Sequence, residues 1–210
     1  MEKYKEIQWI GYPGEARDAS SYLAEFLLLD GKYIQVFKEF DIIVPQSREI
    51  YYNRVCDTPL KRRSSVKRAD LVVITDHRLI PYAASYIPGR HGTSYIVGST
   101  LPPDQNKYKL GFGENAREYE NSDQPELFQT VNLEPGQFGE TSRAGRIVTF
   151  YLPLIAAVAR KLGNYSPESL VLGLHKWLSR HIEPEPAGAA VKVLETNLSP
   201  PVQPPQESLE

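Results

Sequence analysis

The sequence is poor in the residue types that hold redox metals. Its 210 residues include 1 Cys, 4 His and 1 Met. An iron–sulfur cluster needs about four thiolates, and a disulfide needs a pair of them. The chain therefore has too few thiols for a cluster or a disulfide of its own, and a dedicated zinc site is not expected. A lone thiol, at Cys56, is typical of a protein in a reducing cytoplasm.

The sequence also lacks an excess of positive charge and a long apolar run. Its 24 Lys and Arg residues are balanced by 26 Asp and Glu residues, so the whole chain has no positive field to attract nucleic acid or anionic lipid. The longest apolar stretches, Leu23–Leu29 and Leu152–Ala159, are far shorter than the roughly 20 residues that cross a bilayer. Met1–Glu6 has no signal-peptide pattern. We expect no nucleic-acid partner and no membrane segment.

What is present is an alternation of strand and helix patterns. Apolar spacing of three to four residues predicts a helix over Ala16–Asp30, which Gly31 ends, and a short helix is predicted over Arg78–Tyr86. Such alternation predicts an α/β fold with a Rossmann-like, doubly wound, mostly parallel sheet. The fourth strand candidate is apolar throughout, as in a strand covered on both faces. The candidates are Ile7–Ile10, Tyr33–Phe37, Glu49–Cys56, Asp70–Thr75 and Thr93–Gly98.

The C-terminal part of the sequence predicts helices that complete this fold. A helical apolar face runs from Ser142 to Leu162, and Gly163 ends it. Ser166–Pro167 is typical of a helix start, with Ser166 as the N-cap and Pro167 at the first helical position. This helix is expected to end near His181, and a last helix is predicted over residues 187–197.

Two segments lack a regular pattern. Residues 101–140 combine scattered glycines with many acidic residues, and we interpret them as an irregular excursion. Such a stretch is either an arm that contacts a partner chain or an acidic, solvated loop. Residues 199–210 are rich in Pro and have little to bury, so they are expected to form a disordered tail. Residues 1–198 are then expected to be one domain.

The turn after the first strand is the leading candidate for a binding site. It lies where doubly wound folds bind ligands, at the start of a helix whose N–H groups attract anions. The full G-x-G-x-x-G pattern is absent, because Pro13 and Ala16 replace its second and third glycines. Glu39, near the end of the second strand, could accept a ribose hydroxyl or be a solvated or interface carboxylate. The candidate cofactor-binding residues are Gly11, Tyr12, Pro13 and Gly14, with a purely structural turn as the alternative.

Two other polar features are candidate sites. The run Lys61–Arg68 has five positive charges in eight residues, so it could hold a phosphate or an acidic partner, or be a solvated helix face. Asp76 with His77 could be a catalytic pair, but an N-cap role for Asp76 is favoured because a helix pattern follows.

The Cys and the other His residues give no catalytic or metal-binding pattern. His175 and His181 are six apart on one helix and point to different faces, and His91 has no partner at metal-ligand spacing. Cys56 lacks the neighbours of a nucleophile and is predicted to be a small buried side chain. No catalytic residues and no metal ligands are assigned.

Several segments occur in an informative order. Ile7–Gly11 with the turn to Gly14, Gly31–Phe40, Arg54–Leu60 and Ala69–Asp76 are followed by the helical segments Ala144–Leu162 and Ser166–Leu178. In order and spacing they resemble the gamma subunit of the pyruvate/2-ketoisovalerate/2-oxoglutarate:ferredoxin oxidoreductases, over most of residues 6–198. Family members carry a G-x-G-G-Q-G turn after the first strand. This chain retains its first and fourth positions, and Phe40–Arg48 replaces a Gly- and Arg-rich family segment, so the chain resembles a divergent member.

The resemblance implies an accessory subunit of a larger enzyme. Such a complex converts a 2-oxoacid, such as pyruvate or 2-oxoglutarate, to acyl-CoA and passes electrons to ferredoxin. Its thiamine diphosphate, Mg²⁺, iron–sulfur clusters and coenzyme A are expected on the alpha, beta and cluster-bearing subunits or at interfaces. This chain alone is then expected to bind no cofactor and to have no independent activity.

Two other functions were compared with the sequence pattern, and one of them is a real alternative. This alternative is a stand-alone Rossmann-type module that binds a nucleotide or coenzyme A through Gly11–Gly14 and Lys61–Arg68. An independent NAD-dependent dehydrogenase fits poorly, since no proton-donating pair and no intact glycine fingerprint can be assigned.

Overall fold

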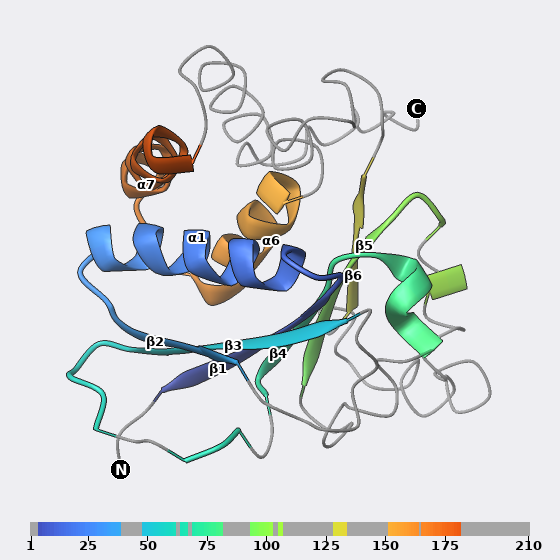
Figure 1. The fold of residues 1–210 in the computed structure, drawn as a ribbon, viewed down its shortest axis with the longest axis horizontal. Coiled ribbons are helices and arrows are strands. Elements are labelled where there is room, and N and C mark those ends of the chain that lie inside the picture. Colours follow the sequence, from blue (N-terminus) through green and yellow to red (C-terminus); the bar gives the residue numbers. More distant parts are fainter. Residues whose placement is uncertain are drawn as a thin grey trace, which may run out of the picture.

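The computed structural model describes residues 4–38, 48–61, 64–66, 69–81, 93–102, 105–106, 128–133, 151–163 and 165–181. These residues form a six-stranded sheet in the order β2-β3-β1-β4-β5-β6 (Figure 1). β1, β4, β5 and β6 run parallel, whereas β3 is antiparallel to both of its neighbours, β1 and β2. The predicted α/β fold with a mostly parallel sheet is confirmed. The strands are β1 (Lys5–Gly11), β2 (Tyr33–Lys38), β3 (Glu49–Cys56), β4 (Leu71–Ile74), β5 (Ser94–Ser99) and β6 (Phe128–Asn132).

The five predicted strands are confirmed as β1 to β5, but β6 was not predicted. It lies inside residues 101–140, which were expected to be irregular, and that expectation is wrong for Phe128–Asn132. This short segment has little periodicity of its own. Its parallel pairing with β5, from Tyr95↔Phe128 to Ser99↔Asn132, makes it a strand. Strand formation here depends on a distant neighbour rather than on local propensity.

Helices α1 (Glu15–Leu29), α6 (Leu152–Leu162) and α7 (Pro167–His181) lie on one face of the sheet (Figure 1). The larger hydrophobic core is between this face and the helices, and it includes Trp9 of β1, Phe26 of α1 and Leu154 of α6. α7 packs on α1. A Cβ atom at Gly173 would lie 2.9 Å from the Cα atom of Phe26, so the glycine allows the close approach of these two helices.

The opposite face carries a second core. Ile10, Val72 and Val97 face Leu79 there, together with Val66 from the segment that precedes β4. All four residues of β4 are buried. The prediction of a strand covered on both faces is therefore confirmed.

The helix ends follow the local signals in the sequence. Ser166 Oγ accepts a hydrogen bond from the N–H of Ser169 at 3.2 Å, and Pro167 is the first residue of α7, as predicted. Gly163, with a φ of +65°, ends α6. Asp30, the C-cap of α1, accepts a hydrogen bond from the N–H of Ser166 at 3.0 Å. This bond joins the end of α1 to the start of α7.

Some predicted segments lie outside the described residues. These are residues 82–86, 142–150, 187–197 and 199–210. In the ranges that the structure does describe, no helix has the length and apolar character needed to cross a membrane.

Candidate functional site

The carboxyl ends of β1 and β4 form the switch point of the sheet. From β1 the chain passes through α1 to β2, two positions away on one side, whereas β4 lies next to β1 on the other side. Ligands of open α/β sheets bind at such a point. The turn Gly11–Gly14 is located there, next to Thr75, whose N–H donates to the carbonyl of Ile10 at 2.9 Å. The structure thus places the predicted turn where the sequence argument expected it.

Gly11 is required by close packing at this point. A Cβ atom on Gly11 would lie 2.9 Å from the backbone nitrogen of Ala16 and 3.1 Å from Thr75 Oγ1. Gly98, at the carboxyl end of β5, is tighter still, because its Cβ would lie 2.5 Å from the carbonyl oxygen of Thr75. Both glycines let backbone segments meet at distances that no side chain permits. Around Gly11 and Gly98, the described residues of the carboxyl edge are therefore closely packed.

The N–H groups of the turn are bonded to side chains of the protein itself. Gly14 donates its N–H to Glu49 Oε2 at 2.9 Å, and Tyr12 donates to Glu15 Oε2 at 3.2 Å. The same Glu15 oxygen accepts the hydroxyl of Thr75 at 2.8 Å. Pro13 has no N–H to offer. Carboxylates thus already accept the N–H groups of Tyr12 and Gly14, and their negative charge disfavours an anion at the same donors.

Asp76 is an N-cap that also pairs with a cation. Its Oδ1 accepts the N–H of Arg78 at 2.8 Å at the start of the 3₁₀ turn η1 (His77–Leu79), so the predicted cap is confirmed. Burial alone would raise the pKa of Asp76, but hydrogen bonds from Arg78 and the charge of its guanidinium outweigh it, so the pKa lies below its usual range. His77 Nδ1 is 3.7 Å from Asp76 Oδ1, which is too long for the hydrogen bond of a catalytic pair.

A buried amide connects part of residues 101–140 to the same edge. Asn106 is fully buried, and its Oδ1 accepts the hydroxyl of Ser99 at 3.2 Å. Its amide donates to the carbonyl of Leu101 at 3.3 Å and to Thr130 Oγ1 at 3.4 Å. These bonds link the carboxyl end of β5 to the middle of β6. No pattern in the sequence marks this asparagine, although Ser99 and Leu101 are only 7 and 5 residues from it and Thr130 is 24 residues away.

The basic run Lys61–Arg68 is described only at Lys61 and at residues 64–66, none of which is helical. For these residues, the interpretation as a helix face is wrong. Val66 is buried in the second core, and the carbonyl of Ser64 accepts a hydrogen bond from Arg54 Nη2 at 2.8 Å. The other four cations of the run lie outside the described residues.

The remaining polar residues from the sequence argument are dispersed. Cys56 is buried, as predicted, with its sulfur 3.3 Å from Thr58 Oγ1. His175 is exposed on α7, whereas Glu39 and His91 lie outside the described residues. In the part of the chain that the structure describes, no three His, Cys, Asp or Glu side chains are grouped as metal ligands would be.

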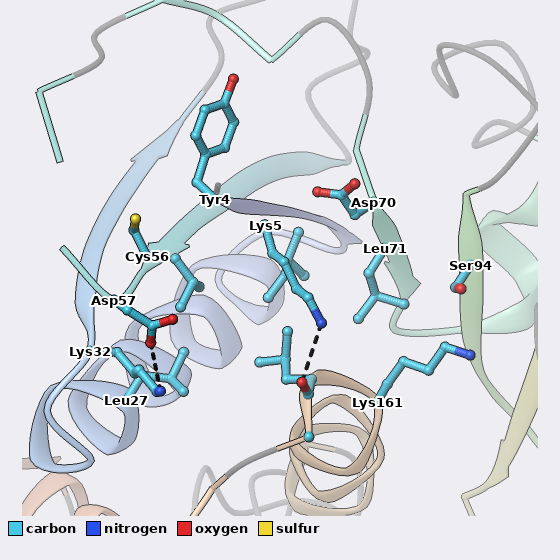
Figure 2. Close-up of a pocket in the computed structure, with 14 residues that line it drawn as sticks. Tyr4, Lys5, Leu27, Lys32, Cys56, Asp57, Asp70, Leu71, Ser94 and Lys161 are labelled. Carbon is cyan, nitrogen blue, oxygen red and sulfur yellow. Dashed lines mark hydrogen bonds and ion pairs between the residues drawn. The ribbon is translucent and has the colours of Figure 1, made fainter. Parts of the chain in front are cut away.

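A pocket that sequence reasoning missed lies at the opposite, amino-terminal edge of the sheet (Figure 2). Its volume is about 680 Å³. It is surrounded by the starts of β1, β4 and β5, the end of β3, the region that joins α1 to β2, and the last turn of α6. Segments far apart in the sequence meet here, so no local motif signals it. The lining residues are Tyr4, Lys5, Ile7, Leu27, Lys32, Val55, Cys56, Asp57, Asp70, Leu71, Ser94, Lys161, Leu162 and Gly163.

Solved structures identify the class of fold. The chain superposes on the pyruvate oxidoreductase subunit PORC of Thermotoga maritima with a TM-score of 0.63 and 20% identity, over 94% of this chain and 96% of that one. The gamma subunit of a keto/oxoacid ferredoxin oxidoreductase from Geobacter sulfurreducens matches with a TM-score of 0.54 and 16% identity, over 93% and 97% of the two chains. The fold of the chain is thus the fold of these subunits.

Sequence comparison with curated proteins gives a more specific similarity than the comparison of folds. Pyruvate synthase subunit PorC of Thermotoga maritima is 39% identical over 80 residues, which is 38% of this chain and 42% of the relative. The common gamma subunit of the pyruvate/ketoisovalerate oxidoreductases of Thermococcus litoralis is 32% identical over 106 residues, or 50% and 57% of the two chains. The matched region spans about half the length of these relatives. No family model matches the chain. The resemblance to gamma subunits inferred from the ordered segments is confirmed.

Proposed function

We propose that this chain is a gamma-type subunit of a thiamine-diphosphate-dependent 2-oxoacid:ferredoxin oxidoreductase. The observation that carries the proposal is that a PorC subunit of Thermotoga maritima matches in two ways. It is 39% identical in sequence over 80 residues, and its fold covers 94% of this chain. The complex would convert a 2-oxoacid such as pyruvate or 2-oxoglutarate to acyl-CoA. The stand-alone nucleotide- or coenzyme-A-binding module is not favoured by these relatives.

The proposed role of the chain is structural. With 1 Cys in the whole sequence, the chain cannot ligate a cluster, so electron transfer would take place on cluster-bearing partners. Thiamine diphosphate and Mg²⁺ would lie on the alpha and beta partners, and the chain would have no activity by itself. Ferredoxin would be an indirect partner, and the complex is expected in the cytoplasm.

The turn Gly11–Gly14 is proposed to contact a partner subunit in this complex. A 2-oxoglutarate:ferredoxin oxidoreductase from Magnetococcus marinus with this fold, at a TM-score of 0.58 and 15% identity, was solved with 2-oxoglutarate, coenzyme A and succinyl-CoA bound. The match covers 94% of this chain and 31% of that one. In the present chain, Glu15 and Glu49 accept the N–H groups that a coenzyme phosphate would need. These bonds disfavour a phosphate cradle at the turn, and the proposed role is therefore a contact with a partner subunit.

Co-purification tests the proposal directly. The full chain is tagged in its native cells and recovered under native conditions, and its partners are identified by mass spectrometry. We expect thiamine-binding and iron–sulfur subunits in stoichiometric amounts, with coenzyme-A-dependent reduction of ferredoxin by one or more 2-oxoacids. Recovery of the chain as a lone monomer would overturn the proposal.

Calorimetry distinguishes the proposed subunit from the stand-alone module. The purified chain is titrated with coenzyme A and with dinucleotides. An accessory subunit is expected to bind them no more tightly than the millimolar range. Micromolar binding at a single site would favour the module instead, because the isolated chain would then hold a complete site.

A further inference from the structure

The outer face of α7 carries an apolar side chain that the fold leaves exposed. α7 packs on α1 and lies farther from the sheet than that helix does (Figure 1). On its inner face Leu170, Leu174 and Trp177 are buried, whereas Leu172 is 57% exposed. A single exposed leucine is common on a protein surface. What Leu172 can bind therefore depends on the side chains around it.

Two charges of opposite sign lie on either side of Leu172. Glu168 precedes it by four residues and Lys176 follows it by four, and both are exposed. Residues four apart share one face of a helix, so the three side chains form a single row along α7. The row consists of an acid, a leucine and a base, with the leucine at its centre.

Both charged side chains already have a contact within the chain, and each keeps capacity for another. Lys176 Nζ is 3.9 Å from Glu25 Oε2, and Arg180 donates a hydrogen bond to the other oxygen of the same carboxylate. The Lys176 contact is longer than a hydrogen bond, and its side chain is 46% exposed. Glu168 accepts the hydroxyl of Ser166 through Oε2 at 2.7 Å, and a carboxylate has about four acceptor sites. Both charges can thus form a further ion pair at the surface.

This row is complementary to itself when it is turned end to end. If two α7 helices lie antiparallel with Leu172 on the two-fold axis, position 168 of one helix faces position 176 of the other, because both are four residues from the axis. The acid of each copy then meets the base of the other, and the two leucines meet in the middle. A parallel arrangement would place like charges together. Use of the same patch on both molecules is the ordinary form of a two-fold dimer.

We propose that a second copy of this chain docks on the outer face of α7, with the two helices antiparallel and Leu172 against Leu172 at the centre. Two ion pairs, each between Glu168 of one copy and Lys176 of the other, flank the leucines. A second copy is favoured over an unrelated chain because the row itself supplies both halves of the match. The contact spans about three helical turns and belongs to the small, weak interfaces, so we expect a dissociation constant of about 0.1–1 mM. The dimer does not depend on the function proposed above, since every residue in it belongs to this chain.

Charge reversal tests the pairing, with sedimentation equilibrium of the full chain measured at concentrations on both sides of the expected constant. Glu168→Lys and Lys176→Glu each turn both ion pairs into like-charge contacts and should weaken dimerisation by about fivefold. The double variant Glu168→Lys/Lys176→Glu restores both pairs with the signs exchanged and should dimerise within about twofold of the unaltered chain. Arg17→Glu is the matched control, because Arg17 is on α1 and its side chain is 54% exposed. Circular dichroism confirms that each variant is folded. A monomer at every concentration, or a double variant no better than the single ones, would overturn the proposal.

Cysteine cross-linking locates the axis. Leu172→Cys places the thiols of the two copies beside the axis, where a disulfide can form. Ser179→Cys is the matched control, because Ser179 is also exposed on α7 but its thiol would lie about 10 Å along the helix from the axis and about 20 Å from its mate. Mild oxidation should link Leu172→Cys chains much faster than Ser179→Cys chains, and Cys56 is buried in both. Equal rates would contradict the assignment. In the complex recovered by co-purification, a cross-link from position 172 to a different subunit would assign this face to that subunit and also overturn the proposal.

Discussion

The two edges of the sheet differ in how completely the protein fills them. At the carboxyl edge, a Cβ atom on Gly11 or Gly98 would clash at 2.9 Å or 2.5 Å, and carboxylates occupy the N–H groups of the turn. At the amino edge, a Cβ atom on Gly163 would meet nothing within 4 Å, and apolar and charged side chains line a cavity of about 680 Å³. Among the described residues, the packing is thus closer around Gly11 and Gly98, at the edge where Rossmann-like folds usually bind ligands, than around the amino-edge pocket.

This difference shows that a position in a fold does not by itself make a binding site. A helix N-terminus attracts an anion only while its N–H groups are free to donate. Glu49 and Glu15 supply that anion from within the chain. The open edge, by contrast, presents groups whose hydrogen-bonding capacity is only partly used, as Lys5 illustrates.

The largest effect is expected when the buried ion pair near the amino edge is broken. Arg54 is 1% exposed, and its Nη2 lies 2.6 Å from Glu6 Oε1, across the β1–β3 pair. Arg54→Ala leaves Glu6 buried without its cation and should lower the free energy of unfolding by about 3–5 kcal/mol. Urea denaturation measures the loss. Arg17→Ala, at an arginine whose side chain is 54% exposed, should cost less than about 0.5 kcal/mol.

Gly→Ala substitutions should lower the stability of the protein by different amounts at the two edges of the sheet. Gly98→Ala and Gly11→Ala place a Cβ atom against backbone atoms and should each cost about 1–3 kcal/mol or more, with Gly98→Ala the costlier. Gly163→Ala meets no atom, so its cost of about 1–3 kcal/mol should come only from the backbone, whose φ of +65° with a ψ of 171° favours glycine. Thermal and urea unfolding rank the three variants. An equal loss at Gly163 and Gly98 would mean that the edges are packed alike.

Removing charge from the closed turn should open it to anions. The double variant Glu15→Ala/Glu49→Ala removes both acceptors and should lose about 1–3 kcal/mol of stability. Pyrophosphate should bind this variant measurably in calorimetry and the unaltered chain not at all. Glu25→Ala, which affects an ion pair between α1 and α7, is the control and should gain no pyrophosphate binding. A double variant that still rejects pyrophosphate would show that Pro13 or the turn geometry excludes it.

The smallest effect on the free energy of unfolding is expected from protonation of Asp76 at acid pH. Its pKa in the folded chain lies below the ordinary value because Arg78 outweighs burial. A depressed pKa adds stability above the unfolded value, about 3.9, and this contribution is lost as the pH falls through the folded value. Arg78 is 68% exposed, so solvent screening should keep the contribution under about 1 kcal/mol.

The stability of Asp76→Asn measured against pH checks this sign. The variant should differ most from the unaltered chain at neutral pH, and the difference should shrink as the pH falls below about 3.9. Carbon-detected NMR of the carboxyl groups should place the midpoint of Asp76 below about 3.9. A gap that widens as the pH falls would contradict the assignment.

Local signals in the sequence predicted the strands and helix ends well. The apolar run of β4, the cap at Ser166 and the stop at Gly163 each depend on a few neighbouring residues. β6 was missed because its short segment becomes a strand only through pairing with β5. The turn Gly11–Gly14 was placed correctly, but its use was not visible, since Glu49 is 35 residues from Gly14 along the chain.

The sequence by itself determined the class of fold, the scarcity of thiols that prevents this chain from holding a cluster, and the likeness to gamma subunits. These follow from residue type, periodicity and order, which are properties of the linear chain. Only the tertiary structure decided which edge of the sheet is closed and which carries a pocket. That outcome depends on Glu49 reaching Gly14 and on Lys5 meeting the end of α6, 157 residues away. Contacts between distant segments form only when the chain folds, so no local pattern encodes them.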